Sequence, residues 1–246
     1  MCWAALDLWF LGHADRAGER IGQALELAGD PAHSYSLART HEHVATLHQL
    51  RREPQSVLEH ATLAIDLGLH QGYEFRAVTG GILRGWARVE LGAIDEGLVE
   101  LRAGIDDYVT SGAEINLPYY IGVLADACLR AGQTAERMQT VDRALEAIVT
   151  NSFCYEAELH RLGGVARIER GDEDEGRNWL RQALDIAGSQ NALSLELRSA
   201  TDIARYATGT KERNGANSLL ADVRSRIEEA TKTPDLVEAD SLLGRA

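Results

Sequence analysis

A glycine that recurs at nearly constant spacing constrains this 246-residue chain more than any other feature. The successive intervals are 80, 40, 39 and 38 residues, and the set is Gly12, Gly92, Gly132, Gly171 and Gly209. The midpoint of the first interval falls at Arg52, inside the segment LRREP (residues 50–54), which also indicates a turn. A glycine between two helices permits a left-handed backbone and a tight hairpin. The spacing therefore predicts one array of about six helix hairpins.

Each of these six positions is followed, twelve residues later, by a residue with a small side chain. These residues are Ala24, Ala64, Gly104, Ala144, Ala183 and Ala221. A small residue about three turns into the second helix allows the partner helix to approach closely. A glycine between helices followed by such a residue is typical of tetratricopeptide repeats, whose usual period is about 34 residues. The longer period here predicts somewhat longer helices or connections.

The composition agrees with an all-helical fold. Ala, Leu, Glu and Arg dominate, and the chain holds only four prolines. We therefore predict an all-α, tetratricopeptide-like α-α superhelix that forms one continuous domain over residues 1–246. The expected repeats span residues 1–30, 32–70, 72–112, 116–151, 152–189 and 191–230, and a capping helix spans 233–245. This terminal helix is expected to cover the last apolar face of the solenoid.

Residues at the predicted helix ends support this division. Pro31 closes the first unit, and the hydroxyl of Ser152 is placed to cap the helix that follows it. In the segment Thr233-Pro234-Asp235 a capping hydroxyl precedes a proline and an acid. Proline suits the first helical position, and an acid suits the positive end of the helix dipole. The segment therefore predicts a helix start.

Charge and cysteine content argue against several classes of function. The formal net charge of −13 repels phosphate and anionic lipid, so neither nucleic acid nor a membrane surface is an expected partner. The sequence shows neither an apolar run of about 18 residues nor a secretory signal pattern. Its cysteines, Cys2, Cys128 and Cys154, are far apart and form no CxxC pair. Reduced thiols and a cytoplasmic location are expected.

Five segments carry a resemblance to a known family. They are residues 8–17 (LWFLGHADRA), 85–92 (GWARVELG), 157–164 (AELHRLGG), 189–200 (SQNALSLELRSA) and 235–243 (DLVEADSLL). In this order they resemble the C-terminal tetratricopeptide region of large bacterial signalling ATPases, and the SLELR block is the most specific. In that family a class III adenylate/guanylate cyclase domain, or a helix-turn-helix DNA-binding domain, precedes an AAA-like nucleotide-binding module. The resemblance implies a regulatory role in signal transduction.

The parts of that family that carry catalysis are not found in this sequence. It contains no GxxxxGK[ST] phosphate loop and no segment typical of a cyclase or DNA-binding domain. The chain begins almost inside its first repeat, so we expect a stand-alone remnant or a fragment of a larger protein. The resemblance therefore implies no ATPase or cyclase activity for this chain, and no cofactor is expected.

Three nearby histidines suggest a metal-binding site, but their spacing argues against one. His41, His43 and His48 follow the pattern i, i+2, i+7, and only His41 and His48 share a helix face. Seven residues span about 10 Å along a helix, too far for one ion without other ligands. We interpret these histidines as polar helix positions and expect no metal site.

Two glycine pairs and an acidic run also have structural interpretations. Gly80 with Gly81, and Gly163 with Gly164, lie in helical context, where they favour close helix packing over phosphate binding. The acids at residues 172–175 follow a repeat glycine and are expected to open a helix rather than to bind calcium.

Charged and aromatic residues are further candidates for contact with a partner. Within the family-like segments these are Glu158, Arg161, Glu196 and Arg198. They either line a groove for a partner or pair across successive repeats, and we favour the pairing. The tryptophans are expected in the core or between repeats rather than in a ligand cage, namely Trp3, Trp9, Trp86 and Trp179. No GxSxG nucleophile motif occurs, so no catalytic residue is assigned.

The sequence thus predicts a non-catalytic regulatory module that binds a protein or peptide on its concave face. By resemblance, the partner is an ATPase or cyclase module. A homodimer through an uncovered solenoid end is a further expectation. The alternative function is a small-ligand sensor domain of a transcriptional regulator, which predicts a pocket with clustered aromatic and polar groups and thermal stabilisation by a metabolite. A third hypothesis, an enzyme, requires a deep cleft with convergent titratable residues.

Overall fold

The computed structural model describes residues 1–29, 34–148, 155–228 and 232–245. Within these ranges the chain forms thirteen α-helices and no β-strand, which confirms the all-α prediction. In chain order the helices are α1 (Cys2–Phe10), α2 (Ala14–Ala28), α3 (Ser34–Leu50), α4 (Pro54–Gln71), α5 (Glu74–Glu90), α6 (Ile94–Thr110), α7 (Leu117–Arg130), α8 (Thr134–Glu146), α9 (Glu156–Arg170), α10 (Glu173–Ser189), α11 (Leu193–Arg205), α12 (Gly209–Ser225) and α13 (Pro234–Leu242). The predictions for Pro31, Ser152 and Cys154 lie outside the described residues.

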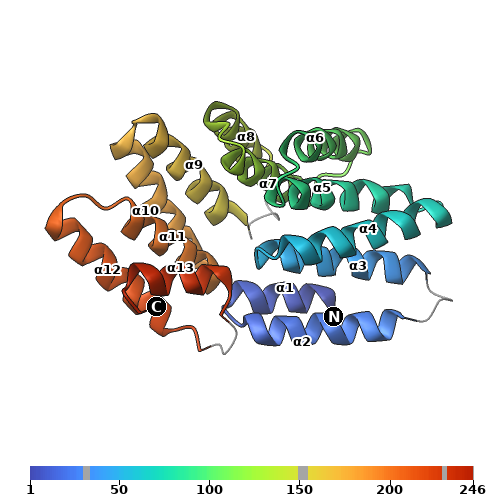
Figure 1. The fold of residues 1–246 in the computed structure, drawn as a ribbon, viewed down its shortest axis with the longest axis horizontal. Helices are drawn as coiled ribbons and strands as arrows, with labels where there is room; N and C mark the ends of the chain where they lie inside the picture. Colours follow the sequence, from blue (N-terminus) through green and yellow to red (C-terminus); the bar gives the residue numbers. More distant parts are fainter. Residues whose placement is uncertain (30–33, 149–154, 229–231, 246) are drawn as a thin grey trace.

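The first twelve helices form six hairpins. Each odd-numbered helix packs against the even-numbered helix that follows it, and the odd-numbered helices also pack against one another in sequence order. Figure 1 shows the hairpins following one another around an arc rather than along a straight line. The odd-numbered helices therefore supply the layer in which side chains from several hairpins meet.

The arc brings the end of the chain back to its beginning. Helix α11 packs against α1, and the hydroxyl of Ser194 donates a hydrogen bond of 2.6 Å to the carbonyl of Trp9. Gly12, at the turn after α1, lies directly against the side chain of Leu193. Helix α13 packs on α11 and α12 (Figure 1). The contact with α11 covers part of the N-terminal edge that the sequence predicts to be open.

The turns inside the hairpins have the predicted left-handed backbone. All five recurrent glycines have positive φ angles, between 71° and 101°. Arg52, at the midpoint of the long interval, has a φ of 57° although it is not a glycine. A non-glycine residue in this region is uncommon, because its Cβ crowds the backbone. The turn at Arg52 therefore has the same left-handed backbone as the glycine turns, but it also carries a charged side chain.

Close helix approach explains the small residues of the repeat. Four of the predicted alanines, Ala24, Ala64, Ala144 and Ala183, are buried, whereas Ala221 is half-buried. A Cβ added at Gly104 would lie 2.7 Å from the side chain of Ile82 on the partner helix. The prediction of close helix approach at this position is confirmed at Gly104, and the burial of four of the alanines agrees with it.

The C-terminal helix starts as predicted. Pro234 occupies the beginning of α13, and the hydroxyl of Thr233 accepts a hydrogen bond from the backbone N–H of Leu236. Leu236 and Ala239 join a second, smaller apolar cluster with Leu197 and Leu220. Helix α13 thus covers apolar side chains of α11 and α12.

Two glycines of α5 allow a test of the close approach. A Cβ at Gly85 would meet backbone atoms 2.8 Å away on α6, whereas a Cβ at Gly81 would meet nothing within 4 Å. We expect Gly85→Ala to destabilise the protein by about 1–3 kcal/mol, because backbone must move. Gly81→Ala should stabilise it by up to about 1 kcal/mol through helix propensity. Urea and thermal unfolding midpoints measure both, and equal shifts for the two variants would contradict the packing account.

Candidate functional site

Three hollows in the described part of the protein are candidate sites. The first, called here the arginine cavity, has a volume of about 300 Å³ and is lined by residues of α7, α9, α11 and α13 and by Arg52. The second, the aromatic pocket, has a volume of about 90 Å³ and is lined by side chains that include Trp3, Phe10 and Tyr119. The third is an open outer groove of about 730 Å³ between α10, α11 and α12.

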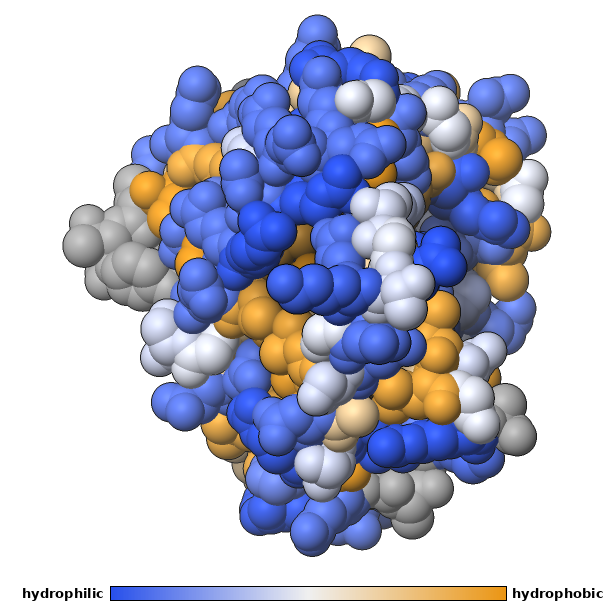
Figure 2. Space-filling model, turned by 90° about the vertical axis from the view of Figure 1, so that its left-hand side faces the viewer, coloured by the Kyte–Doolittle hydropathy of each residue, from blue (hydrophilic) through white to orange (hydrophobic). Residues whose placement is uncertain are grey.

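The outer groove is mainly apolar. Its lining includes Leu184, Ile203, Ala216 and Leu219. Figure 2 views the molecule from the side that carries α10 and α12, and apolar surface is visible there between hydrophilic residues. The groove offers few polar groups that converge on one point, so it does not define a ligand by chemistry.

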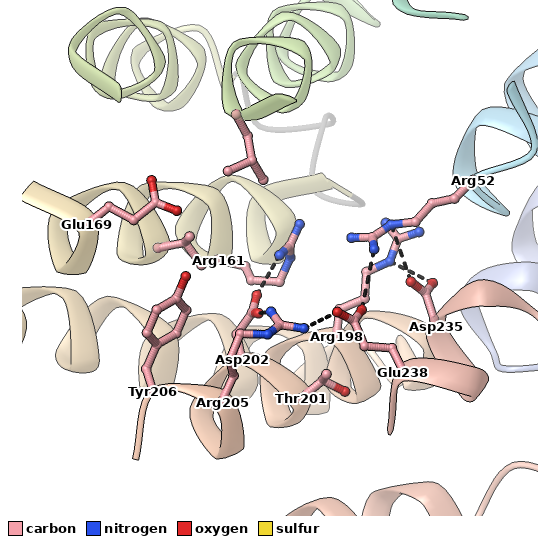
Figure 3. A pocket seen from close by; sticks show the side chains of 12 residues that line it. Arg52, Arg161, Glu169, Arg198, Thr201, Asp202, Arg205, Tyr206, Asp235 and Glu238 are labelled. Carbon is pink, nitrogen blue, oxygen red and sulfur yellow. Dashed lines mark hydrogen bonds and ion pairs between the residues drawn. The ribbon is translucent and has the colours of Figure 1, made fainter. Parts of the chain in front are cut away.

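The arginine cavity is built around a closed ring of ion pairs, in which four arginines alternate with four acids. In order around the ring, each paired with the next and the last with the first, the residues are Glu158, Arg161, Asp202, Arg205, Glu238, Arg52, Asp235 and Arg198. Figure 3 shows the members that line the cavity and the side chains that point toward one another across it. The ring joins the α3–α4 turn to α9, α11 and α13, so it links the early part of the chain to its end.

One half of the ring is buried and tightly bonded. Arg161 donates to both oxygens of Glu158 at 2.8 Å and to Asp202 at 2.5 Å. Arg198 donates to Glu158 at 3.1 Å and to Asp235 at 2.8 Å. The side chains of Glu158, Arg161, Arg198 and Asp202 are only 2–4% exposed. Buried charges require such complete pairing, because each would otherwise lose its hydration without compensation.

The other half of the ring is exposed and looser. The side chains of Arg52, Arg205 and Glu238 are 31%, 35% and 41% exposed. Arg52 lies 3.3 Å from Asp235 and 3.6 Å from Glu238, measured between nitrogen and oxygen. Exposed ion pairs contribute little net stability, because water and salt screen them. These three side chains can therefore exchange partners at small cost.

The electrostatics of the buried half keep its groups charged. Burial acts to raise the pKa of the Glu158 carboxyl, but the guanidinium groups of Arg161 and Arg198 outweigh it and lower the pKa to about 2. Burial acts to lower the pKa of Arg161, but Glu158 and Asp202 raise it well above its ordinary value. The carboxylates of the ring are all engaged by guanidinium groups. The arrangement is suited to holding hydrogen-bonding groups rather than to abstracting a proton.

A smaller hollow of about 170 Å³ adjoins the arginine cavity and shares Arg52 and Leu129 with it. Its wall includes Glu90, and both burial and the charge of Asp126 raise the pKa of that carboxyl. Asp126 accepts a hydrogen bond of 2.8 Å from the indole N–H of Trp86. The opening shared by this hollow and the arginine cavity is called here the mouth. Hydrogen-bond donors and acceptors are mixed around it, and neither positive nor negative side chains predominate.

The aromatic pocket is separated from the arginine cavity by Arg198 and Leu50. Leu50 lines the aromatic pocket, while its carbonyl accepts a hydrogen bond from Arg198, which lines the arginine cavity. The guanidinium of Arg198 also lies over the ring of Trp9, 5.0 Å from its centre. The two hollows are therefore distinct sites.

The pairing predicted across successive repeats is present for one of the two expected acids. Arg198 on α11 bonds to Glu158 on α9, and Arg161 belongs to the same cluster. Glu196 instead accepts two hydrogen bonds from Arg226, at 2.7 and 3.0 Å. Glu196 is therefore not part of the arginine cavity.

The tryptophan prediction is right for three residues and wrong for one. Trp9 and Trp86 are buried, and Trp179 packs against Arg167 at 3.6 Å between the guanidinium carbon and the ring centre. Trp3 is 51% exposed and lines the aromatic pocket. Its ring meets the ring of His43 edge-on at the rim of that pocket, which leaves its other side open to solvent.

The histidines lie on two faces of α3. His41 and His48 do share a face: the Nδ1 atoms of His41 and His60 lie 3.0 Å apart, and the rings of His48 and His60 stack at 5.8 Å. His43 contacts Trp3 on the other side. Within the described ranges, no group of three or more His, Cys, Asp or Glu residues is arranged to hold a metal ion.

Helix packing accounts for three of the four paired glycines. Gly80 lies against Ile65, Gly163 against Trp179, and Gly164 against Gly176. A Cβ at Gly81 would meet nothing within 4 Å, so packing does not explain this glycine. The acidic run opens α10 as predicted, with Glu173, Asp174 and Glu175 in its first turn.

Only part of the ring carries a signal in the sequence. Glu158, Arg161 and Arg198 lie in the family-like segments and are predicted to pair, whereas Asp202 and Arg205 belong to no local motif that distinguishes them from other surface charges. Two further members are marked by their positions in the sequence. Arg52 occupies a repeat turn where glycine is expected, and Asp235 follows the proline that opens α13.

Comparisons with known proteins do not identify a family for this chain. No model of a known protein family matches the chain. A search of curated proteins also finds no match. None of the described helices is long and apolar enough to cross a lipid bilayer.

The buried half of the ring predicts a large difference between two arginines. Arg198→Met should destabilise the protein by about 3–5 kcal/mol, because Asp235 keeps only the partly exposed Arg52 as a partner and the buried Glu158 loses one of its two guanidinium partners. Arg170→Met, which removes an exposed pair with Asp172, should change stability little. Unfolding midpoints of the two variants measure this, and a small effect of Arg198→Met would show that the ring is not bonded as described.

The histidine cluster predicts acid sensitivity. Burial and the neighbouring His60 lower the pKa of His41 from 6.5 to about 4. The unfolded chain therefore takes up a proton below pH 6.5 that the folded protein resists, so stability is complete above pH 6.5 and falls toward pH 4. His41→Asn should reduce this loss by about 2 kcal/mol. Unfolding free energies at pH 7 and pH 4.5 test it, and an unchanged pH slope in the variant would contradict it.

Proposed function

We propose that this chain is a non-catalytic regulatory module, a tetratricopeptide-like solenoid that binds a protein partner at the mouth formed by the arginine cavity. Six hairpins with left-handed turns and small residues at their crossings support the repeat assignment. The last hairpin and α13 meet the first repeats through the ion-pair ring and the bond of Ser194 to Trp9.

The observation that carries this proposal is the unequal bonding of the ring. Its buried half fixes α9 and α11, whereas Arg52, Arg205 and Glu238 are partly exposed and border a cavity of about 300 Å³. A polar group of a partner can enter the cavity and take over bonds of these three residues. Arg52 lies on the turn between α3 and α4, and Glu238 lies on α13. A partner that replaces the bond between them therefore changes the contact between the early repeats and the end of the array.

The charge balance of the mouth sets the kind of partner. Acids and arginines are equal in number around the ring, so a polyanion gains no net attraction there. A peptide segment that offers both donors and acceptors matches the mouth better. By the resemblance described above, the partner is an ATPase or cyclase module in the cytoplasm.

The concave face is a poor place for a long peptide in this conformation. Side chains of the odd-numbered helices bond to one another across it, as in the pair of Arg76 with Glu42 and the pair of Tyr119 with Gln49. The accessible polar groups lie at the mouth, so we place the partner there.

The alternative function is small-ligand sensing, which the volume of the cavity favours. A volume of about 300 Å³ falls at the lower end of the range for small-molecule pockets. A ligand that bonds both to Arg52 and to α13 would stabilise the closed array. This function predicts a rise in unfolding temperature with ligand concentration.

Affinity capture with matched variants tests the proposal. The ring variant is Arg205→Gln with Glu238→Gln, which removes one charge of each sign, and the control is Arg170→Gln with Asp172→Asn on the outer surface. We expect a protein partner that the wild type and the control retain and the ring variant loses, as read by mass spectrometry.

Two other outcomes have defined meanings. Equal retention by all three proteins would show that the partner does not use the arginine cavity. Failure to capture a protein, together with a metabolite that raises the unfolding temperature of the wild type but not of the ring variant, would favour the ligand-sensing alternative.

A further inference from the structure

We propose that the aromatic pocket is a second binding site, specific for the headgroup of an alkylated ammonium ion. The pocket is separated from the ion-pair ring by Arg198 and Leu50 and is lined by residues of α1, α3 and α7 together with Tyr155. The side chains that carry the inference are Trp3, Asp7, Phe10, Tyr119, Tyr120 and Tyr155.

The aromatic rings are held in place before any ligand binds. The ring of Tyr119 meets that of Tyr120 at 5.2 Å and that of Tyr155 at 5.1 Å, between ring centres. The hydroxyl of Tyr119 donates to Gln49 at 2.9 Å, and the hydroxyl of Tyr120 donates to Glu42 at 3.3 Å. Side chains fixed in this way lose little conformational entropy on binding, which favours affinity.

The charge of the pocket favours a cation. Asp7 is exposed at the rim, and its carboxylate makes no hydrogen bond or ion pair with the described residues. Glu42 is already paired with Arg76, so its charge is offset. Neither lysine nor arginine lines the pocket among the described residues. Burial lowers the pKa of His43, assisted by the charges of Arg39 and Arg76, so this histidine adds no positive charge at neutral pH.

Aromatic faces and an unpaired carboxylate together define the ligand class. The face of an aromatic ring attracts a cation, and clustered rings recognise quaternary ammonium groups in particular. A methylated ammonium keeps an apolar surface for the rings, while Asp7 supplies the opposite charge. An anion would meet repulsion from Asp7, and a neutral apolar group would leave that carboxylate unused.

The size of the pocket limits the ligand to a headgroup. Its volume is about 90 Å³. An apolar cavity of about 150 Å³ admits benzene, so this pocket suits a group somewhat smaller than that ring. Trp3 is half exposed, so the rest of the ligand can extend past it into solvent. A free quaternary ammonium ion such as choline and a trimethylated lysine of a peptide share this chemistry.

Calorimetric titration of the full chain with choline chloride tests the inference, with 3,3-dimethyl-1-butanol as the neutral analogue of the same shape. We expect saturable binding of choline and at least about tenfold weaker binding of the alcohol. Asp7→Asn and Trp3→Ala should each weaken choline binding roughly fivefold. The control Asp106→Asn removes an exposed acid on α6 and should leave binding unchanged.

Circular dichroism of the variants confirms that they are folded, which is expected because Asp7 and Trp3 are both exposed. Absence of saturable binding up to about 10 mM choline, equal binding of the alcohol, or an unaffected Asp7→Asn variant would each overturn the proposal. A peptide with trimethyl-lysine, compared with its unmethylated form, separates the two sources of the headgroup. Tighter binding of the methylated peptide than of choline would assign the site to a protein partner.

Discussion

The structure depends on the ring of ion pairs that joins the start of the array to its end. Buried ion pairs add little net stability, because the loss of hydration offsets their attraction, yet removal of one partner is costly. The ring formed by Glu158, Arg161, Arg198 and their partners therefore selects one closed arrangement more than it strengthens the fold. Its exposed members, Arg52 and Glu238, are the part that a binding partner can reach.

Closure also decides the chemistry of the interior. When an array of hairpins curls until its first and last hairpins touch, as α1 and α11 do here, the inner side chains lose contact with water and must bond to one another. The bonds of Tyr119 with Gln49 and of Trp86 with Asp126 are of this kind. The result is two separate hollows with different chemistry, one of alternating charges and one of aromatic rings. A long open groove, which the repeat pattern alone suggests, is not what these residues form.

Much of the local structure could be predicted because its causes act over a few residues. The left-handed turns at Gly12 and its equivalents, and the cap at Thr233, follow from backbone geometry within one or two turns of helix. The pair of Glu158 with Arg198 joins neighbouring repeats, so the repeat spacing could predict it. The sequence places Trp3 in the core, but exposure depends on which neighbours cover α1, and spacing does not report that.

The sequence by itself determined the helical class, the number of hairpins and the conformation of their turns, because glycine spacing, small residues and capping groups act locally. Only the tertiary structure decided that the array closes, and hence which charges meet. Ser194 and Trp9 are 185 residues apart, and Arg198 and the carbonyl of Leu50 are 148 apart. Such contacts depend on the rotation between successive hairpins summed over the whole array. A small change in each rotation would separate these residues while leaving every local pattern intact.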